Sequence, residues 1–128
     1  MARERGYFDG QTRAFINLRF PGGLANLQID TGFNRHVLIG DATAARLGLN
    51  AIPGFVMAQP AGSAQPFRVA IAHVDVMWLG QLRRLDVLIY GNEQPRPRGE
   101  PDGLLGTGLI HPGKLVLDYL SGIVEISE

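Results

Sequence analysis

Glycine and proline divide this sequence into short segments, and this punctuation constrains its fold more than any other feature. The 128 residues include 17 Gly and 8 Pro. Between them, apolar and polar side chains alternate in several segments, which is the period of a β-strand with one buried face. The combination predicts short strands joined by turns.

The alternation is clearest in the first third of the chain. Residues 14–20 and 25–30 are predicted strands, separated by a turn at 21–23. A third strand is expected at 37–39. A short helix should follow it, with Asp41 as the N-cap and Gly48 at the C-terminal end.

A long hairpin is predicted over residues 55–78, with its tip at 60–63. The phase of the apolar residues changes near Ala72 and His73, which predicts a bulge or bend there. The remaining elements follow the same rules: strands at 85–89, 115–117 and 124–126, and a turn at 120–122.

The stretch 91–103 is polar and rich in Pro and Gly. We interpret it as a solvated extended loop; the alternative is that Arg96 and Arg98 bind an acidic partner. Arg83 and Arg84 are interpreted as the polar end of a strand. Together these elements predict an all-β fold, a small closed or nearly closed barrel with one or two short helices, as a single domain over residues 1–128.

Composition excludes several kinds of function. The absence of Cys excludes disulfides, thiolate nucleophiles and zinc-thiolate sites. Twelve basic and 12 acidic residues cancel, so nothing favours nucleic acid or an anionic membrane as a partner. The three His residues lack ligand spacing, and no metal is expected. The N-terminus lacks the apolar stretch of a signal peptide, and no apolar run would span a membrane, so a cytoplasmic location is expected.

The polar triplet Asp30-Thr31-Gly32 ends the second predicted strand. Asp, Thr and Gly are common turn residues, so the triplet alone is compatible with an ordinary turn. The alternative is chemical. A carboxylate can act as general base on a water molecule if a second carboxylate shares its proton, because two like charges about 3 Å apart cannot both ionise. The chain has one such triplet, and a two-fold homodimer would supply the second copy.

In its wider context the triplet resembles the retropepsin-like aspartic proteases, in particular their small single-domain prokaryotic group. The similarity runs through Asp-Thr-Gly-Phe-Asn and the following strand and helix up to Leu49, the hairpin tip Ala61-Gly62-Ser63, Val76-x-Trp78-x-Gly80, Leu104-Leu105-Gly106-Thr107 and the closing hairpin. It covers residues 12–127.

This resemblance implies a role for several residues. Asp30 would be the catalytic carboxylate, one per subunit, with Thr31 bonding across the dimer and Gly32 holding the active-site loop. Gly106 would lie behind that loop, and Ala61, Gly62 and Ser63 would form a flap over a peptide substrate. Residues 1–10, as an N-terminal arm, or 122–128 would build the dimer interface.

The sequence departs from the family pattern at Phe33, Ala61, Gly108 and the long loop 91–103. None of these changes removes a catalytic atom. The expected function is therefore a homodimeric aspartic endopeptidase that uses water and no cofactor. The alternative is a catalytically silent domain of the same fold that binds peptides or mediates assembly.

Overall fold

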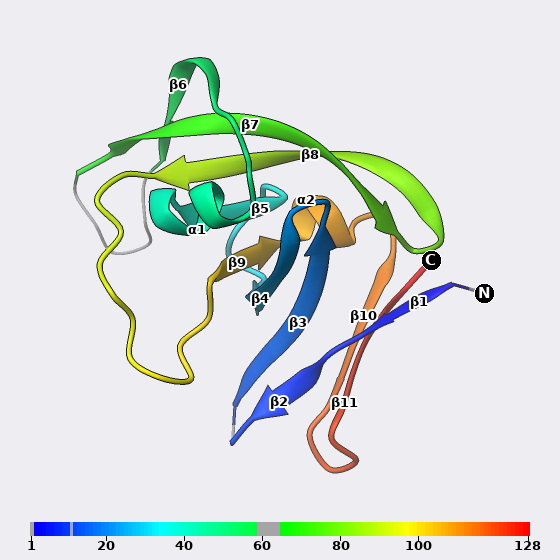
Figure 1. The fold of residues 1–128 in the computed structure, drawn as a ribbon. Helices are drawn as coiled ribbons and strands as arrows, with labels where there is room; N and C mark the ends of the chain where they lie inside the picture. Colours follow the sequence, from blue (N-terminus) through cyan, green and yellow to red (C-terminus); the bar gives the residue numbers. More distant parts are fainter. Residues whose placement is uncertain (1, 11, 59–64) are drawn as a thin grey trace.

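The computed structural model describes residues 2–10, 12–58 and 65–128, and strands dominate it (Figure 1). The order of elements is β1 (Arg3–Arg5), β2 (Tyr7–Asp9), β3 (Arg13–Phe20), β4 (Gly23–Asp30), β5 (Val37–Gly40), α1 (Asp41–Arg46), β6 (Ile52–Ala58), β7 (Phe67–Trp78), β8 (Gln81–Tyr90), β9 (Gly103–Gly106), α2 (Thr107–Ile110), β10 (Lys114–Asp118) and β11 (Ile123–Ser127).

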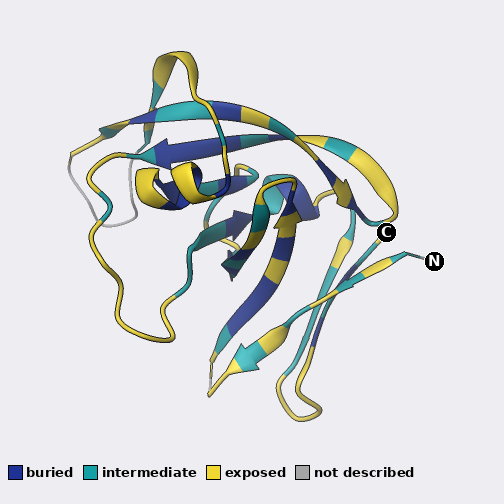
Figure 2. Ribbon diagram, in the orientation of Figure 1, coloured by how far each residue is buried: buried dark blue, intermediate teal, exposed yellow. Residues whose placement is uncertain are grey.

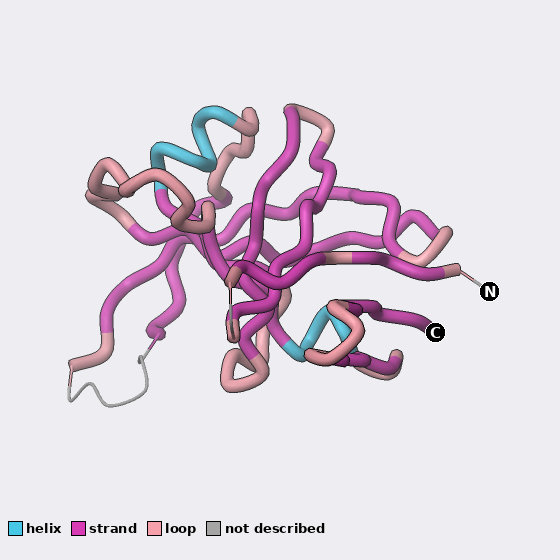
Figure 3. The backbone as a smooth tube through the Cα atoms, turned by 90° about the horizontal axis from the view of Figure 1, so that it is seen from below, coloured by secondary structure: helices cyan, strands magenta, loops and turns pink. Residues whose placement is uncertain are grey.

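Within the described residues the strands form two sheets. The larger sheet has the order β2-β3-β4-β9-β5-β8-β7-β6, and the smaller sheet has the order β1-β11-β10. The larger sheet curls without closing, because β2 and β6 remain its two ends. Figures 1 and 3 place both chain termini on the same side of the molecule, beside the smaller sheet.

Tight turns set the register of the longest hairpin. Trp78 in β7 faces Gln81 in β8, so Leu79 and Gly80 form a two-residue loop. Both loop residues have left-handed backbone angles, with φ of 51° and 76°. This is the type of turn whose twist matches that of the two flanking strands.

The core lies between the curled strands, where the dark blue segments of Figure 2 gather. Alternate residues of each strand point inward. Leu27 and Ile29 of β4, Val37 and Ile39 of β5, and Leu105 of β9 belong to one buried cluster. Burial of each such side chain contributes roughly 1.5–3 kcal/mol, so the inward faces of these strands fix which residues face outward.

Of the bulge or bend predicted near Ala72 and His73, the bulge is not present. The register between β7 and β8 runs without a break from Ala70 to Trp78, and the shift lies in β6, between Ile52 and Val56. The phase of the apolar residues changes because β7 is apolar on both faces. Even-numbered residues such as Ala72 enter the core, whereas Val69 shares the opposite face with Val56, its pair in β6.

The helix α1 begins one residue earlier than expected. Its N-cap is Gly40, and Asp41 is its first helical residue. Asp41 is not free to cap the helix, because its carboxylate accepts hydrogen bonds from the N–H groups of Asn92 and Glu93, both at 3.0 Å. The predicted end is confirmed: Gly48 has φ of 71° and its N–H bonds to the Ala45 carbonyl.

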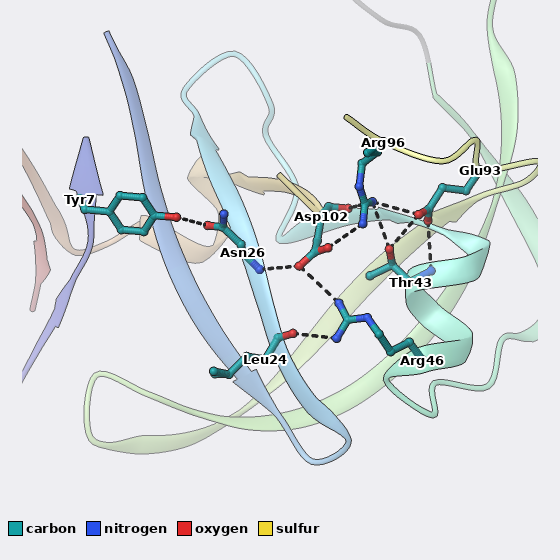
Figure 4. Close-up of polar contacts among 8 residues, drawn as sticks. All are labelled: Tyr7, Leu24, Asn26, Thr43, Arg46, Glu93, Arg96 and Asp102. Carbon is teal, nitrogen blue, oxygen red and sulfur yellow. Dashed lines mark hydrogen bonds and ion pairs between the residues drawn. The ribbon is translucent and has the colours of Figure 1, made fainter. Parts of the chain in front are cut away.

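The polar loop at 91–102 is largely exposed, as expected, but the side chain of Glu93 is shielded from solvent and that of Arg96 is paired. The Glu93 side chain is 6% exposed. It accepts hydrogen bonds from the N–H and the hydroxyl of Thr43, at 3.1 and 3.0 Å (Figure 4). Arg96 bridges Glu93 at 2.9 Å and Asp102 at 2.7 Å. Arg96 thus remains partly exposed, as expected for a solvated loop, but it is held between two carboxylates.

Asp102 connects this network to the sheet. It accepts a hydrogen bond from the N–H of Asn26 in β4 at 2.8 Å, and its own N–H donates to the Asn26 carbonyl at 2.7 Å. Arg46 of α1 lies 3.3 Å from the same carboxylate (Figure 4). The loop thus joins α1 to β4 through charged side chains just before β9 begins.

Two short strands near the N-terminus were not predicted. β1 pairs with β11, and β2 pairs with β3. Residues 3–5 and 7–9 are therefore part of the two sheets.

Candidate active site

Asp30 is the last residue of β4, beside the parallel strand β9, where Gly106 is its register partner. The preceding residue, Ile29, points into the core. Because side chains alternate along a strand, Asp30 points to the opposite face, where its side chain is partly exposed. The core thus determines the face on which this carboxylate appears.

The loop after Asp30 folds back on the carboxylate. Asp30 Oδ1 accepts a hydrogen bond from the N–H of Gly32 at 2.9 Å, and the N–H of Phe33 donates to the Asp30 carbonyl at 3.1 Å. A Cβ atom at residue 32 would lie 3.3 Å from Oδ1. Glycine therefore leaves space for the close approach of backbone and carboxylate.

The loop also packs directly on β9 and α2. The N–H of Gly106 donates to the His36 carbonyl at 2.9 Å, and the N–H of Thr107 donates to the Phe33 carbonyl at 2.8 Å. A Cβ atom on Gly106 would lie 2.5 Å from that Phe33 carbonyl and closer still to the Arg35 carbonyl. Gly106 is thus required for the loop to lie in this position.

Gly108, which departs from the family pattern, has the same kind of role. A Cβ atom there would lie 2.8 Å from the Asn34 carbonyl. The short helix α2 still forms over Thr107–Ile110. A small residue at this position lets the helix approach the loop.

Strand β8 also contacts the loop that follows Asp30. His36 Nδ1 accepts a hydrogen bond from the N–H of Asp86 at 2.9 Å. Burial, and then the positive charge of Arg83, lower the pKa of His36. Arg83 itself donates to the carbonyls of Gly108 at 3.1 Å and Leu109 at 3.0 Å. Arg83 lies near the start of β8, as expected, but it is half-buried and holds α2 through these two carbonyl groups.

A cleft of about 460 Å³ opens beside Asp30. Strand pairing explains the apolar lining of the cleft. Leu38 in β5 is paired with Leu104 in β9 on one side and with Leu88 in β8 on the other. These residues share the face of the sheet that carries Asp30. The cleft is also lined by loop residues and by the hairpin of β6 and β7, namely Gly32, Phe33, Asn34, Arg35, Val56, Met57, Ala58 and Phe67.

The structure brings together four of the predicted site residues, Asp30, Thr31, Gly32 and Gly106. The predicted flap residues Ala61, Gly62 and Ser63 lie outside the described residues. His36, Arg83 and Gly108 were not predicted as supports of the loop. A glycine directly after Thr107 was a usable signal for close packing, whereas nothing local in the sequence pairs His36 or Arg83 with the loop.

The described residues contain no group of three or more His, Asp or Glu placed to hold a metal ion. They also contain no helix that is both long and apolar enough to cross a membrane.

Comparisons with known proteins agree on the fold. No family model matches the sequence, and no curated protein sequence matches it significantly. Among solved structures, the chain is similar to a retropepsin-like aspartic protease from Rickettsia conorii, with a TM-score of 0.65 and 15% identity over 97% of this chain and 89% of the other. It is also similar to EIAV protease bound to the inhibitor HBY-793, with a TM-score of 0.58 and 17% identity over 86% and 98% of the two chains. This chain therefore has the all-β retropepsin-like fold that its sequence predicts.

Proposed function

We propose that this protein is a homodimeric aspartic endopeptidase. The observation that carries the proposal is the position of Asp30. Its carboxylate is oriented by the Gly32 N–H and lines an apolar cleft large enough for peptide side chains. Of the two solved structures of similar fold, one is described as a retropepsin-like aspartic protease and the other as a protease bound to an inhibitor, which supports the same chemistry here.

One chain supplies one carboxylate, so a second copy must supply the other. With the two Asp30 side chains facing each other across a two-fold axis, one proton is shared between them. One carboxylate then takes a proton from the attacking water while the other donates a proton to the oxygen of the scissile carbonyl. The pair titrates as a unit, and the reaction needs no cofactor.

Thr31 fits a role in that pairing. It is exposed, and its hydroxyl makes no hydrogen bond within the part of the chain that the structure describes, so it is available to bond to a second copy. We propose that the second copy also contacts the smaller sheet, because its edge strand β10 is paired on one side only among the described strands. Residues 61–63 remain the proposed flap.

The test is cleavage of a peptide library between about pH 3 and 7, the range over which a carboxylate pair changes its protonation. Wild type should cleave, and Asp30→Asn should not. Asp75→Asn serves as the matched control, because Asp75 is an exposed carboxylate paired with Arg84 away from the cleft. Equal cleavage by wild type and Asp30→Asn would overturn the proposal. Peptide binding without cleavage by wild type would favour the catalytically silent alternative.

A further inference from the structure

The cleft beside Asp30 carries one positive charge. Its walls are apolar over β5 to β9, and its polar residues gather on the loop at 30–35. Among the described residues that line it, Arg35 is the single cation and Asp30 the single anion. A peptide lying in the cleft would therefore meet Arg35 next to the reacting carboxylate.

The backbone of Arg35 is fixed although its side chain is free. Its carbonyl packs against Gly106 so closely that no Cβ atom would fit between them. The guanidinium is exposed and forms no hydrogen bond or ion pair with the described part of the chain. It also lies more than 4.0 Å from the Asp30 carboxylate, because no ion pair joins them.

Most of the other arginines in the described residues already have a partner within the chain. Arg13, Arg46, Arg84 and Arg96 form ion pairs with carboxylates, and Arg83 bonds to carbonyl groups of α2. An unpaired guanidinium on a fixed backbone is suited to bind a carboxylate with two parallel hydrogen bonds. Only the side chain has to become ordered on binding, since the backbone of the loop is already in place.

We propose that this cleft selects peptides with an Asp or Glu side chain close to the large apolar side chain that fills it. The inference rests on the proposed peptide substrate but not on its hydrolysis. Arg35 supplies the charge complementarity, and the apolar lining by residues such as Leu38 and Leu88 excludes a second charged side chain from the interior of the cleft. Arg35 is thus a specificity residue.

The test uses matched peptide pairs that differ only in Glu or Gln beside one Leu or Phe. Binding is measured by fluorescence anisotropy on Asp30→Asn, and kcat/KM is measured on wild type. The Glu peptide should bind about tenfold more tightly, as expected for one charge-assisted contact at a partly exposed site. Added salt should reduce the difference.

Arg35→Gln should abolish the preference, and Arg35→Glu should transfer it to a Lys peptide. Arg98→Gln is the matched control, because it removes the same charge from the exposed loop at 91–102 and should leave the preference intact. Equal binding of the Glu and Gln peptides, no binding of either, or a preference that survives Arg35→Gln would each overturn the inference. Loss of the dimer in Arg35→Gln would also overturn it, by assigning Arg35 to the subunit interface.

These outcomes are separable from those of the proposed function. Cleavage without a Glu preference would reject the inference and keep the peptidase. Binding of the Glu peptide that depends on Arg35, with no cleavage by wild type, would keep the inference and reject the peptidase.

Discussion

The loop at 31–36 and the loop at 91–102 both join strands of the larger sheet, but different atoms hold them. The first loop is fixed by backbone hydrogen bonds from Gly106 and Thr107 and by glycines that admit no Cβ atom. The second loop is fixed by charged side chains, with Arg96 between Glu93 and Asp102 (Figure 4).

The difference determines which groups of each loop remain free to make other contacts. Fixing the first loop through its backbone leaves the side chains of Thr31 and Arg35 free to meet a second subunit or a substrate. Fixing the second loop through ion pairs uses its charged side chains and leaves most of its residues exposed. Substitutions that add atoms against the backbone should therefore disrupt the first loop, and substitutions that remove a charge should disrupt the second.

The largest effect should come from Gly106→Ala. The new Cβ atom would collide with the carbonyls of Phe33 and Arg35, so the loop that holds Asp30 would have to move. We expect a loss of about 3 kcal/mol or more in the free energy of unfolding, measured by urea denaturation, and loss of peptidase activity. Gly91→Ala is the control, because a Cβ atom there meets nothing within 4 Å; equal stability of the two variants would contradict the account.

Glu93→Gln should have the next largest effect. It leaves Arg96 without its buried partner and weakens the acceptor for Thr43, which we expect to cost about 2–3 kcal/mol. Activity per folded molecule should be retained, since the loop at 31–36 does not depend on this network. Glu100→Gln, which removes an exposed pair with Arg13, should cost less than about 1 kcal/mol. Loss of activity in fully folded Glu93→Gln would show that the two loops are coupled.

Arg83→Met should act on the first loop through α2. The variant keeps an apolar stem but removes the hydrogen bonds to the carbonyls of Gly108 and Leu109, at a cost of about 1–2 kcal/mol. Because α2 positions the Phe33 carbonyl through Thr107, kcat should fall more than KM rises. A change in KM alone would argue that Arg83 has no part in positioning Asp30.

The smallest effect on stability should come from lowering the pH, which protonates His36. Its pKa is lowered in the folded state, so the unfolded chain takes up the proton first as the pH falls. Stability should therefore decline as the pH drops below about 6.5, the ordinary value for His. In His36→Asn the side-chain oxygen can still accept from the Asp86 N–H. Urea denaturation at several pH values should show a shallower decline, and an unchanged slope would refute this assignment.

Asp41 adds a second decline at lower pH. Its pKa is lowered by hydrogen bonds from the N–H groups of Glu93 and Asn92, so its stabilisation is present above about pH 4 and is lost as the pH falls further. Asp41→Asn should flatten the stability curve in that lower range and leave the decline near pH 6 intact.

Local patterns predicted most of the strands, although not β1, β2 or β9, and they predicted the face of Asp30, because alternation records which side of a strand is buried. They predicted Gly48 because glycine commonly ends a helix, whereas the position of Gly106 behind the loop was expected only from the resemblance to the protease family. They failed where a contact joins distant segments, as between Arg96 and Glu93 or between Arg83 and α2. They also failed at β7, because the apolar cleft makes its second face resemble a core face.

The central claim is that each active site takes one Asp30 from each of two chains. The most direct measurement mixes wild type and Asp30→Asn in equal amounts, allows subunits to exchange, and compares activity with the same total amount of wild type. If both chains must contribute a carboxylate, about a quarter of the activity should remain, because only wild-type pairs are active. If about half remains, each chain carries a complete site, and the shared acid pair is contradicted.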